Sequence, residues 1–184
     1  MKILLLGCKG QVGWELQRAL SPLGELTACD FDTPLRADFS APESLAALVE
    51  QVQPDVIANA AAHTAVDKAE HDQDACFALN RDGAALLARA AARRNIPVIH
   101  LSTHYVFDGR KPAPYDETDA PSPATVYGRS KLEGEQAVAA ANPRHVIVRT
   151  GWVFSTAANG FAARMLTAAA SGAALKLVDD QRGN

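Results

Sequence analysis

The sequence has few cysteines, no excess of basic residues and no long hydrophobic run. Its three cysteines, Cys8, Cys29 and Cys76, form no CxxC pair and are odd in number, which argues against an oxidising compartment and for a cytoplasmic one. With 18 Lys and Arg against 21 Asp and Glu, the net charge is −3, so we expect no nucleic-acid partner. Apolar stretches end well short of the roughly 18 residues of a membrane span, and no signal peptide opens the chain, so we expect no membrane partner.

The 184 residues, 48% of them hydrophobic, are enough for one packed domain and a little more. Short apolar runs alternate with segments of helical periodicity. We expect strands at Lys2–Gly7, Leu26–Cys29, Asp55–Ala58, Pro97–Leu101, His145–Arg149 and Ala174–Val178. We expect helices at Gln11–Leu20, Glu43–Val52 (with Ser40 as N-cap), Gln73–Arg94, Ala124–Ala141 and Phe161–Ala170. This alternation predicts an α/β fold with a doubly wound, Rossmann-like parallel sheet.

A glycine-rich loop, Gly7-Cys8-Lys9-Gly10-Gln11-Val12-Gly13, joins the first expected strand to the first expected helix. In it, Gly7 permits a tight turn, Gly10 lets the backbone approach a pyrophosphate, and Gly13 lets helix and strand pack closely. A glycine triplet alone also fits a purely structural turn. Its position between a strand and a helix favours a dinucleotide-binding loop.

Asp30 ends the second expected strand, near the spacing at which an acid bonds the adenosine ribose of a dinucleotide. A carboxylate there favours NADH because it repels the 2′-phosphate of NADPH, whereas Lys9 can neutralise that phosphate. The alternative for Asp30 is a solvated turn residue. Asp38 and Phe39 follow in a region where an adenine can lie against the backbone or the phenyl ring.

Tyr127 and Lys131 stand four residues apart in an expected helix and so share one face. A lysine ammonium beside a tyrosine, with an oxidised nicotinamide nearby, lowers the phenol pKa from about 10 and suits it to proton transfer. The YxxxK spacing alone arises often by chance. Here Thr103 follows an expected strand at the edge where ligands of such sheets bind, so the three residues together favour catalysis.

Three further positions stay open between structural and functional interpretations. The small residues of Asn59–Thr64 let a flat cofactor lie close to the backbone, and His63 among them is either structural or catalytic. Asn80 interrupts an expected helix, either to bond a backbone bulge or on an exposed face. Trp152 is either a core residue or a platform for a sugar or base ring.

Five segments carry a likeness that extends over all 184 residues: GCKGQVGWELQRALSPLG, NAAAHTAVDKAE, STHYVFDG, YGRSKLEGE and RTGWVF. Together they resemble the extended short-chain dehydrogenase/reductases, and within them the dTDP-4-dehydrorhamnose reductase family. The resemblance implies reduction of the C4 ketone of dTDP-4-dehydro-L-rhamnose to dTDP-L-rhamnose with NADPH or NADH, a step of dTDP-rhamnose and lipopolysaccharide biosynthesis. It also implies a homodimer in the full-length protein, and Mg²⁺ in full-length members, for which no ligand set is visible in these residues.

Carried over residue by residue, the resemblance extends the interpretation of the motifs to a full set of site residues. The catalytic residues are Thr103, Tyr127 and Lys131. The cofactor-binding residues are Gly7, Gly10, Gln11, Val12, Gly13, Asp30, Asp38, Phe39, Ala62, His63, Thr64, Leu101, Tyr127 and Lys131. The substrate-binding residues are Thr103, His104 and Trp152.

The chain departs from the family pattern in two respects. His104 stands where the family usually has an aspartate that touches the sugar. Family members are also longer, and the polar ending of this chain looks cut rather than finished. We therefore expect residues 1–155 to form the dinucleotide-binding domain and residues 156–184 to begin a smaller substrate-binding region.

Two other functions were weighed against the reductase. A non-catalytic NAD(P)-binding regulatory subunit of the same fold is the alternative, and retention of Thr103, Tyr127 and Lys131 together argues against it. The related sugar-nucleotide dehydratases place an Asp-Glu pair after the threonine, where this chain has His104 and Tyr105. Without that carboxylate pair, elimination of water is disfavoured.

Overall fold

Five parallel strands form one sheet in the order β2-β1-β3-β4-β5. The structure is a computed structural model that describes residues 1–155, 160–172, 174, 175 and 177. Its strands are β1 (Lys2–Leu6), β2 (Glu25–Cys29), β3 (Val56–Asn59), β4 (Val98–Thr103) and β5 (His145–Thr150). Apart from Lys2, β1 is buried throughout, as its continuous apolar run predicts for a strand covered on both faces.

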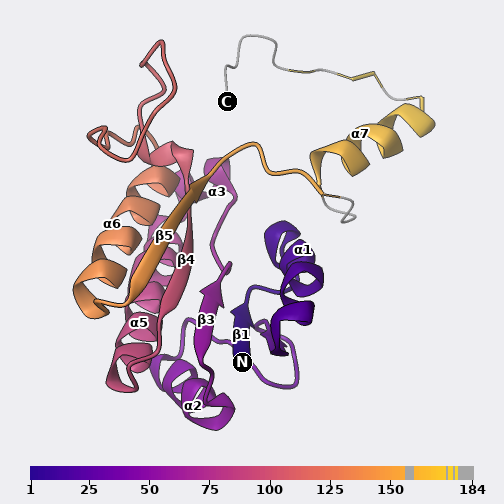
Figure 1. Cartoon of the computed structure of the whole chain (residues 1–184). Helices are drawn as coiled ribbons and strands as arrows, with labels where there is room; N and C mark the ends of the chain where they lie inside the picture. The colour runs from indigo at the N-terminus through magenta and orange to yellow at the C-terminus, as the bar shows by residue number, and fades with distance from the viewer. Residues whose placement is uncertain (156–159, 173, 176, 178–184) are drawn as a thin grey trace.

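Helices cover both faces of the sheet, and the doubly wound Rossmann-like fold is thereby confirmed (Figure 1). Within the described residues they are α1 (Gln11–Leu20), α2 (Pro42–Val52), α3 (Val66–His71), α4 (Gln73–Phe77), α5 (Ala84–Arg93), α6 (Val126–Ala141) and α7 (Phe161–Ala170). One face carries α1, whereas α2, α5 and α6 pack side by side on the other. This division follows from right-handed crossovers, because the chain runs one way from β1 to β2 and the opposite way from β2 onward.

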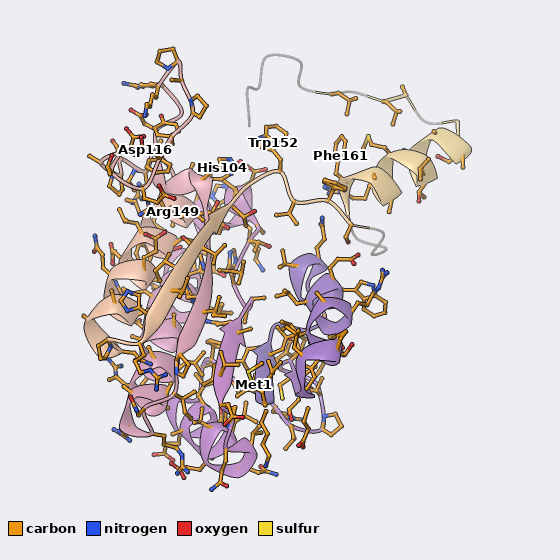
Figure 2. The ribbon with its side chains drawn as sticks, in the orientation of Figure 1. Met1, His104, Asp116, Arg149, Trp152 and Phe161 are labelled. Atoms are coloured by element: carbon orange, nitrogen blue, oxygen red, sulfur yellow. The ribbon has the colours of Figure 1, made fainter. Side chains whose placement is uncertain are left out.

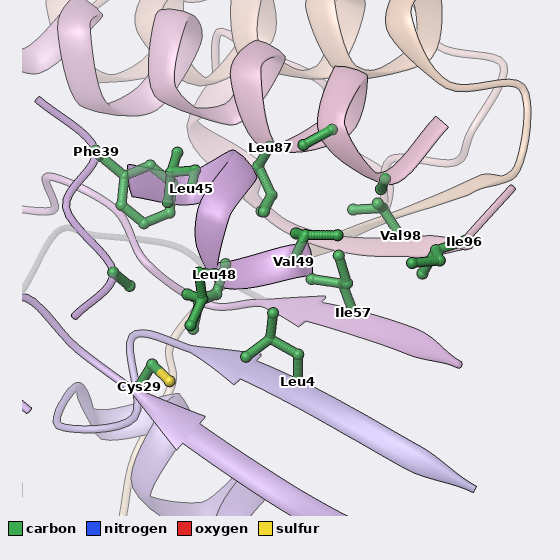
Figure 3. Close-up of a cluster of buried hydrophobic side chains, with 14 residues drawn as sticks. Leu4, Cys29, Phe39, Leu45, Leu48, Val49, Ile57, Leu87, Ile96 and Val98 are labelled. Carbon is green, nitrogen blue, oxygen red and sulfur yellow. The ribbon is translucent and has the colours of Figure 1, made fainter. Parts of the chain in front are cut away.

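The main core lies between the sheet and the layer formed by α2 and α5 (Figure 3). Leu4, Ile57 and Val98 project from three adjacent strands towards Leu45 and Leu87 on the two helices. The helical periodicity of these segments places such residues on one face, so the same pattern that predicts the helices also builds the core.

The strand order reverses between β1 and β3, because the chain leaves β1 in one direction and reaches β3 from the other. At such a switch point the loops after neighbouring strands diverge and open a crevice at the carboxyl ends. The glycine-rich loop follows β1 and the Ala60–Thr64 segment follows β3, so both reach this crevice.

The predicted N-cap at Ser40 is wrong. Helix α2 begins at Pro42, and Ala41 occupies the N-cap position without a side-chain bond. The Ser40 amide and hydroxyl instead donate to the Asp38 carboxylate, at 2.9 and 2.6 Å. The Ser40 side chain therefore takes part in an Asx-type turn with Asp38 and does not form the capping box.

The single helix predicted over 73–94 is interrupted. It consists of α4, a π-helical segment η2 (Ala78–Gly83) and α5, and it is preceded by the short α3, which the sequence pattern did not indicate. The extra residue of a π turn points a side chain out of helical register. Asn80 lies within this segment and is 1% exposed, so the exposed-face alternative is wrong; its side chain bonds the backbone of His63 and not a bulge.

The last predicted strand, over 174–178, does not form at Ala174, Leu175 or Leu177, while Lys176 and Val178 lie outside the described residues. Of the helices the structure describes, none combines the length and apolarity needed to cross a bilayer.

Gly13 fits the packing role that its place in the loop predicts. A Cβ at this position would collide with the carbonyl oxygen of Gly7 and lie 2.8 Å from Cys8 Cα. At Gly10 the nearest atom to an added Cβ is the same carbonyl oxygen, at 3.3 Å. The close contact between loop and helix therefore leaves no room for a Cβ at Gly13. At Gly10 a Cβ would need only a small shift of its neighbour.

We expect Gly13→Ala to lower the free energy of unfolding by about 1–3 kcal/mol, because the added methyl group forces the loop and α1 apart. Gly10→Ala is the matched control and should cost clearly less. Urea unfolding of the two variants measures the difference. Equal losses would mean that the contact between Gly7 and Gly13 does not limit packing here.

Candidate active site

A cavity of about 1160 Å³ lies at the carboxyl ends of the strands. Of the residues that the sequence assigns to the site, all but Gly13 line it: Gly7, Gly10, Gln11, Val12, Asp30, Asp38, Phe39, Ala62, His63, Thr64, Leu101, Thr103, His104, Tyr127, Lys131 and Trp152. Residues from seven separate stretches of the chain thus meet in one cavity large enough for a small-molecule ligand.

The glycine-rich loop forms one wall of the cavity. Gly7 has a φ of +77°, and a Cβ there would lie 2.5 Å from the Ala61 amide nitrogen, so only glycine fits. The Gly7 and Cys8 N–H groups donate to the carbonyl of Cys29, which braces the turn against β2. Helix α1 starts at this wall with no side-chain cap, so its first N–H groups are free to meet an anion.

Asp30 stands at the end of β2 with both carboxylate oxygens engaged. Its Oδ2 accepts the Lys9 amide N–H at 3.0 Å, and its Oδ1 accepts the Phe31 amide at 2.9 Å. These bonds hold the carboxylate at the cavity wall. The Lys9 ammonium turns away to Asp32, 2.7 Å from its Oδ2, and this contact raises the pKa of Lys9.

Asp38 and Phe39 close the cavity beside Asp30. Hydrogen bonds from Ser40 lower the pKa of the Asp38 carboxyl. Phe39 is 8% exposed and belongs to the main core, where its ring leaves room only for a glycine at position 83. The ring therefore lines the cavity from a fixed position.

The Ala62–Thr64 segment is held in place by the π-helical segment. Asn80 Oδ1 accepts the His63 amide N–H at 2.8 Å, and Asn80 Nδ2 donates to the His63 carbonyl at 3.1 Å and to Ser130 Oγ at 2.9 Å. His63 thus has its backbone fixed, while its buried Nδ1 has no hydrogen-bond partner among the described residues.

Tyr127 lies in the first turn of α6, 8% exposed, opposite Thr103 at the end of β4. Thr125 caps the helix, accepting the Gly128 amide at 3.0 Å. Burial raises the pKa of Tyr127, whereas a hydrogen bond with Thr103 lowers it. The net direction is upward, opposite to the lowering that the lysine pairing predicts, because burial outweighs the Thr103 bond.

Lys131 is almost fully buried one helical turn beyond Tyr127. Its Nζ donates to the Leu101 carbonyl at 2.7 Å and lies 3.3 Å from His100 Nε2. Burial lowers the pKa of Lys131 to about 8. In this state the Lys131 amine is engaged by β4.

The predicted substrate contacts lie where β5 ends (Figure 2). His104 packs so closely on Gly151 that a Cβ at that glycine would collide with the imidazole Nδ1. This nitrogen is buried, and no residue in the described part of the chain bonds it. Trp152 follows with a φ of +51°, strained for a tryptophan, and half of it is exposed. Gln11 Nε2 bonds the carbonyl of Val153 at 2.7 Å, which ties this segment to the glycine-rich loop.

Sequence reasoning missed two buried residues beside the cavity, Asn59 and His100, each 1% exposed. They bond each other at 3.1 Å, from paired positions on β3 and β4. A signal was present, because each is a polar residue in or directly after a run that predicts a buried strand. No cluster of three or more acidic, histidine or cysteine side chains suited to a metal occurs in the part of the chain that the structure describes.

Comparison with known proteins places these features in one family. The model of the RmlD substrate binding domain matches residues 1–184. A dTDP-4-dehydrorhamnose reductase of Salmonella typhimurium is 47% identical over 184 residues, which are 100% of this chain and 62% of that protein. The chain thus spans about 62% of the length of this curated relative.

Two solved structures show the same fold. The dTDP-4-dehydrorhamnose reductase of Clostridium acetobutylicum matches with a TM-score of 0.86 and 37% identity, over 93% of this chain and 60% of that one. The enzyme of Bacillus anthracis, solved in complex with NADP, matches with a TM-score of 0.87 and 32% identity, over 92% of this chain and 60% of that one.

Proposed function

The chain belongs to the RmlD substrate binding domain family, and from this premise we propose that it is the dinucleotide-binding part of a reductase acting on the C4 ketone of dTDP-4-dehydro-L-rhamnose. The product is dTDP-L-rhamnose, and the cofactor is NADPH or NADH. The observation that carries the proposal is the meeting of Thr103, Tyr127 and Lys131 in one cavity with the glycine-rich loop.

The residues present fit a dinucleotide. The loop has no side chain at its closest approach to the β3 loop, the first N–H groups of α1 are uncapped, and the Asp30 carboxylate is fixed beside them. A pyrophosphate suits the helix N-terminus, and ribose hydroxyls suit Asp30. When bound, the reduced nicotinamide supplies the hydride for the ketone carbon.

Tyr127 serves as the general acid that protonates the ketone oxygen. The phenol of Tyr127 is protonated at neutral pH and can donate, but burial raises its pKa, so groups that stabilise the phenolate must offset that rise during proton transfer. As the proton leaves, the phenolate accepts a hydrogen bond from Thr103, whose effect on the pKa is already in the direction that stabilises the anion. Lys131, when protonated, adds a positive charge to the same face of α6 and holds the nicotinamide ribose.

The sugar nucleotide lies over the outer end of the cavity in this proposal. Trp152 offers a half-exposed ring for stacking, and His104 stands directly after Thr103, in the place of the family's aspartate. His104 and Tyr105 provide no carboxylate pair, so the proposal is reduction and not dehydration.

The proposal extends to the organisation and setting of the protein. Residues 1–155 act as the dinucleotide-binding domain, and residues 156–184 begin the substrate-binding region. The protein works in the cytoplasm, as a homodimer at the length of its relatives, without nucleic-acid or membrane partners. The small net charge of −3 supports the absence of a nucleic-acid partner.

The decisive experiment adds dTDP-4-dehydro-L-rhamnose and either NADPH or NADH to a version of the protein extended to the length of its relatives. We expect the reduced cofactor to be consumed in proportion to the keto-sugar. Cofactor binding without consumption would favour the regulatory-subunit alternative.

In that extended protein, Tyr127→Phe should lower turnover by about 10²–10⁴, because the phenol oxygen is lost while the ring still fills its place. Dinucleotide affinity should stay nearly unchanged. Stopped-flow measurement of reduction, paired with calorimetry, tests both statements. A variant that retains more than a tenth of the parent rate would remove Tyr127 from the acid role.

Asp30→Ala should weaken NADH by roughly 1.5–3 kcal/mol and NADPH by less, because the carboxylate accepts from ribose hydroxyls but repels a 2′-phosphate. Asp32→Ala is the matched control, since it removes a neighbouring carboxylate that bonds Lys9. Calorimetric titration with each cofactor measures both variants. Equal weakening of the two cofactors by Asp30→Ala would contradict the proposed ribose contact.

The 184-residue chain itself should bind dinucleotide yet turn over little or no keto-sugar. Hydride transfer needs the ketone held close to the cofactor, and a misplacement of about 1 Å can cost around 10²-fold in rate. Calorimetry with NADH, beside a turnover assay of the longer protein, measures both properties. Rates from the 184 residues that equal those of the longer protein would show that these residues suffice.

A further inference from the structure

Asn59, His100 and Lys131 form a buried row beneath the cavity. Asn59 ends β3, His100 faces it in the register of β4, and Lys131 reaches them from α6. Asn59 Nδ2 lies 3.1 Å from His100 Nδ1, and His100 Nε2 lies 3.3 Å from Lys131 Nζ. All three residues are 1% exposed, so their polar groups depend on the hydrogen bonds within the row and to its neighbours.

The hydrogen bond between Asn59 and His100 can have only one donor. The Ala61 amide N–H donates to Asn59 Oδ1 at 3.1 Å. A flipped amide would set two donors against each other, so Asn59 must present its Nδ2 donor to His100. His100 Nδ1 therefore accepts a hydrogen bond and carries no proton.

The hydrogen bond from Asn59 also determines which nitrogen of His100 carries the proton next to Lys131. Burial, with a smaller contribution from Lys131, lowers the pKa of His100 to about 3, so the ring is neutral and holds one proton. With Nδ1 bare, that proton sits on Nε2 and faces Lys131 Nζ. An ammonium has no lone pair to accept it, whereas an uncharged amine accepts it and still donates to the Leu101 carbonyl.

We propose that Asn59 and His100 are positioning residues that hold Lys131 as an uncharged hydrogen-bond acceptor and couple its protonation to the tautomer of His100. Protonation of Lys131 requires Nε2 to become the acceptor, the His100 proton to move to Nδ1, and the bond from Asn59 to break. The role of Lys131 in catalysis rests on the proposed function, but the coupling itself does not.

Charged and ionisable groups around the Lys131 amine also shift its pKa. On α6, Glu135 favours the charged form of Lys131, and so does Cys76 on α4. Arg149 on β5 engages both oxygens of Glu135, at 2.9 and 2.6 Å, which weakens the attraction of Glu135 for Lys131. Burial outweighs these attractions and places the pKa of Lys131 near 8, so the amine and ammonium forms exchange close to neutral pH.

This arrangement suits the chemistry proposed for the site. A permanent ammonium at this depth would be an unneutralised buried charge, which is costly. The uncharged Lys131 amine is satisfied by His100 and the Leu101 carbonyl, and a negative group formed nearby, such as the Tyr127 phenolate, would favour its protonated form.

Nuclear magnetic resonance of the ¹⁵N,¹³C-labelled 184-residue chain tests the proposal without any substrate. Above the Lys131 midpoint, we expect the His100 proton on Nε2, and below it a shift of that proton to Nδ1. The Lys131 midpoint should lie more than one pH unit below the ordinary lysine value of about 10.4, a difference above tenfold in proton affinity. Protonation of Nδ1 at every pH, or a Lys131 midpoint at the ordinary lysine value, would overturn the proposal.

In Asn59→Asp the carboxylate accepts hydrogen bonds from both Ala61 and His100. The donor in the bond between position 59 and His100 is then the imidazole. We expect the His100 proton on Nδ1 and a Lys131 midpoint raised by at least tenfold in proton affinity. The added charge alone also raises this midpoint, so the control is Asn59→Asp combined with His100→Leu, where the rise should be clearly smaller. An unmoved tautomer, or an equal rise in the control, counts against the proposal.

The test depends neither on the folding of the Asn59→Asp variant nor on the reductase proposal. If Asn59→Asp does not fold, the titration of the parent chain still decides, because its His100 tautomer is predicted in advance. Failure of the keto-sugar assay would leave the coupling intact, and a wrong tautomer would leave the reductase proposal intact.

Discussion

The side chain of Asn80 is the constraint on which the site depends most. It projects from the π-helical segment and bonds both backbone groups of His63 and the hydroxyl of Ser130, one residue before Lys131. Helix α6 approaches so closely that a Cβ at Gly134 would collide with the Asn80 carbonyl. One buried amide thereby sets the loop after β3 against the helix that carries Tyr127. Each of its bonds is worth about 0.5–1.5 kcal/mol, and each partner left unpaired costs more.

A second polar cluster fixes the same helix one turn beyond Lys131. Glu135 accepts from Ser102 at 2.5 Å and from Arg149 through two nitrogens, and it raises the pKa of the guanidinium. Because Ser102 precedes Thr103, this cluster positions the end of β4 against α6. Arg149 also lies over the Phe107 ring, 5.0 Å from its centroid, which extends the cluster to the segment after β4. Helix α6 is thus held by buried polar contacts next to Lys131, through Ser130, and one turn beyond it, through Glu135.

Much of this architecture could be predicted from local pattern. Alternating strands and helices give the doubly wound sheet, and the residues assigned to the site converge because parallel strands end at one edge. The errors occurred where a local rule met a competing partner. Ser40 matches a capping pattern, yet the Asp38 carboxylate two residues away takes its hydroxyl. The helix over 73–94 has continuous periodicity, yet a π-helical segment interrupts it at Asn80, whose side chain bonds His63 and Ser130.

The sequence by itself determined the fold class, the glycine-rich loop and the pairing of Tyr127 with Lys131, because each depends on spacing within a short stretch of chain. Only the tertiary structure decided what each polar group faces. Burial of Tyr127 reverses the expected direction of its pKa shift, and His100, 31 positions before Lys131, meets its amine. Such contacts join residues from different strands and helices. Their geometry depends on how those elements pack, which no local spacing encodes.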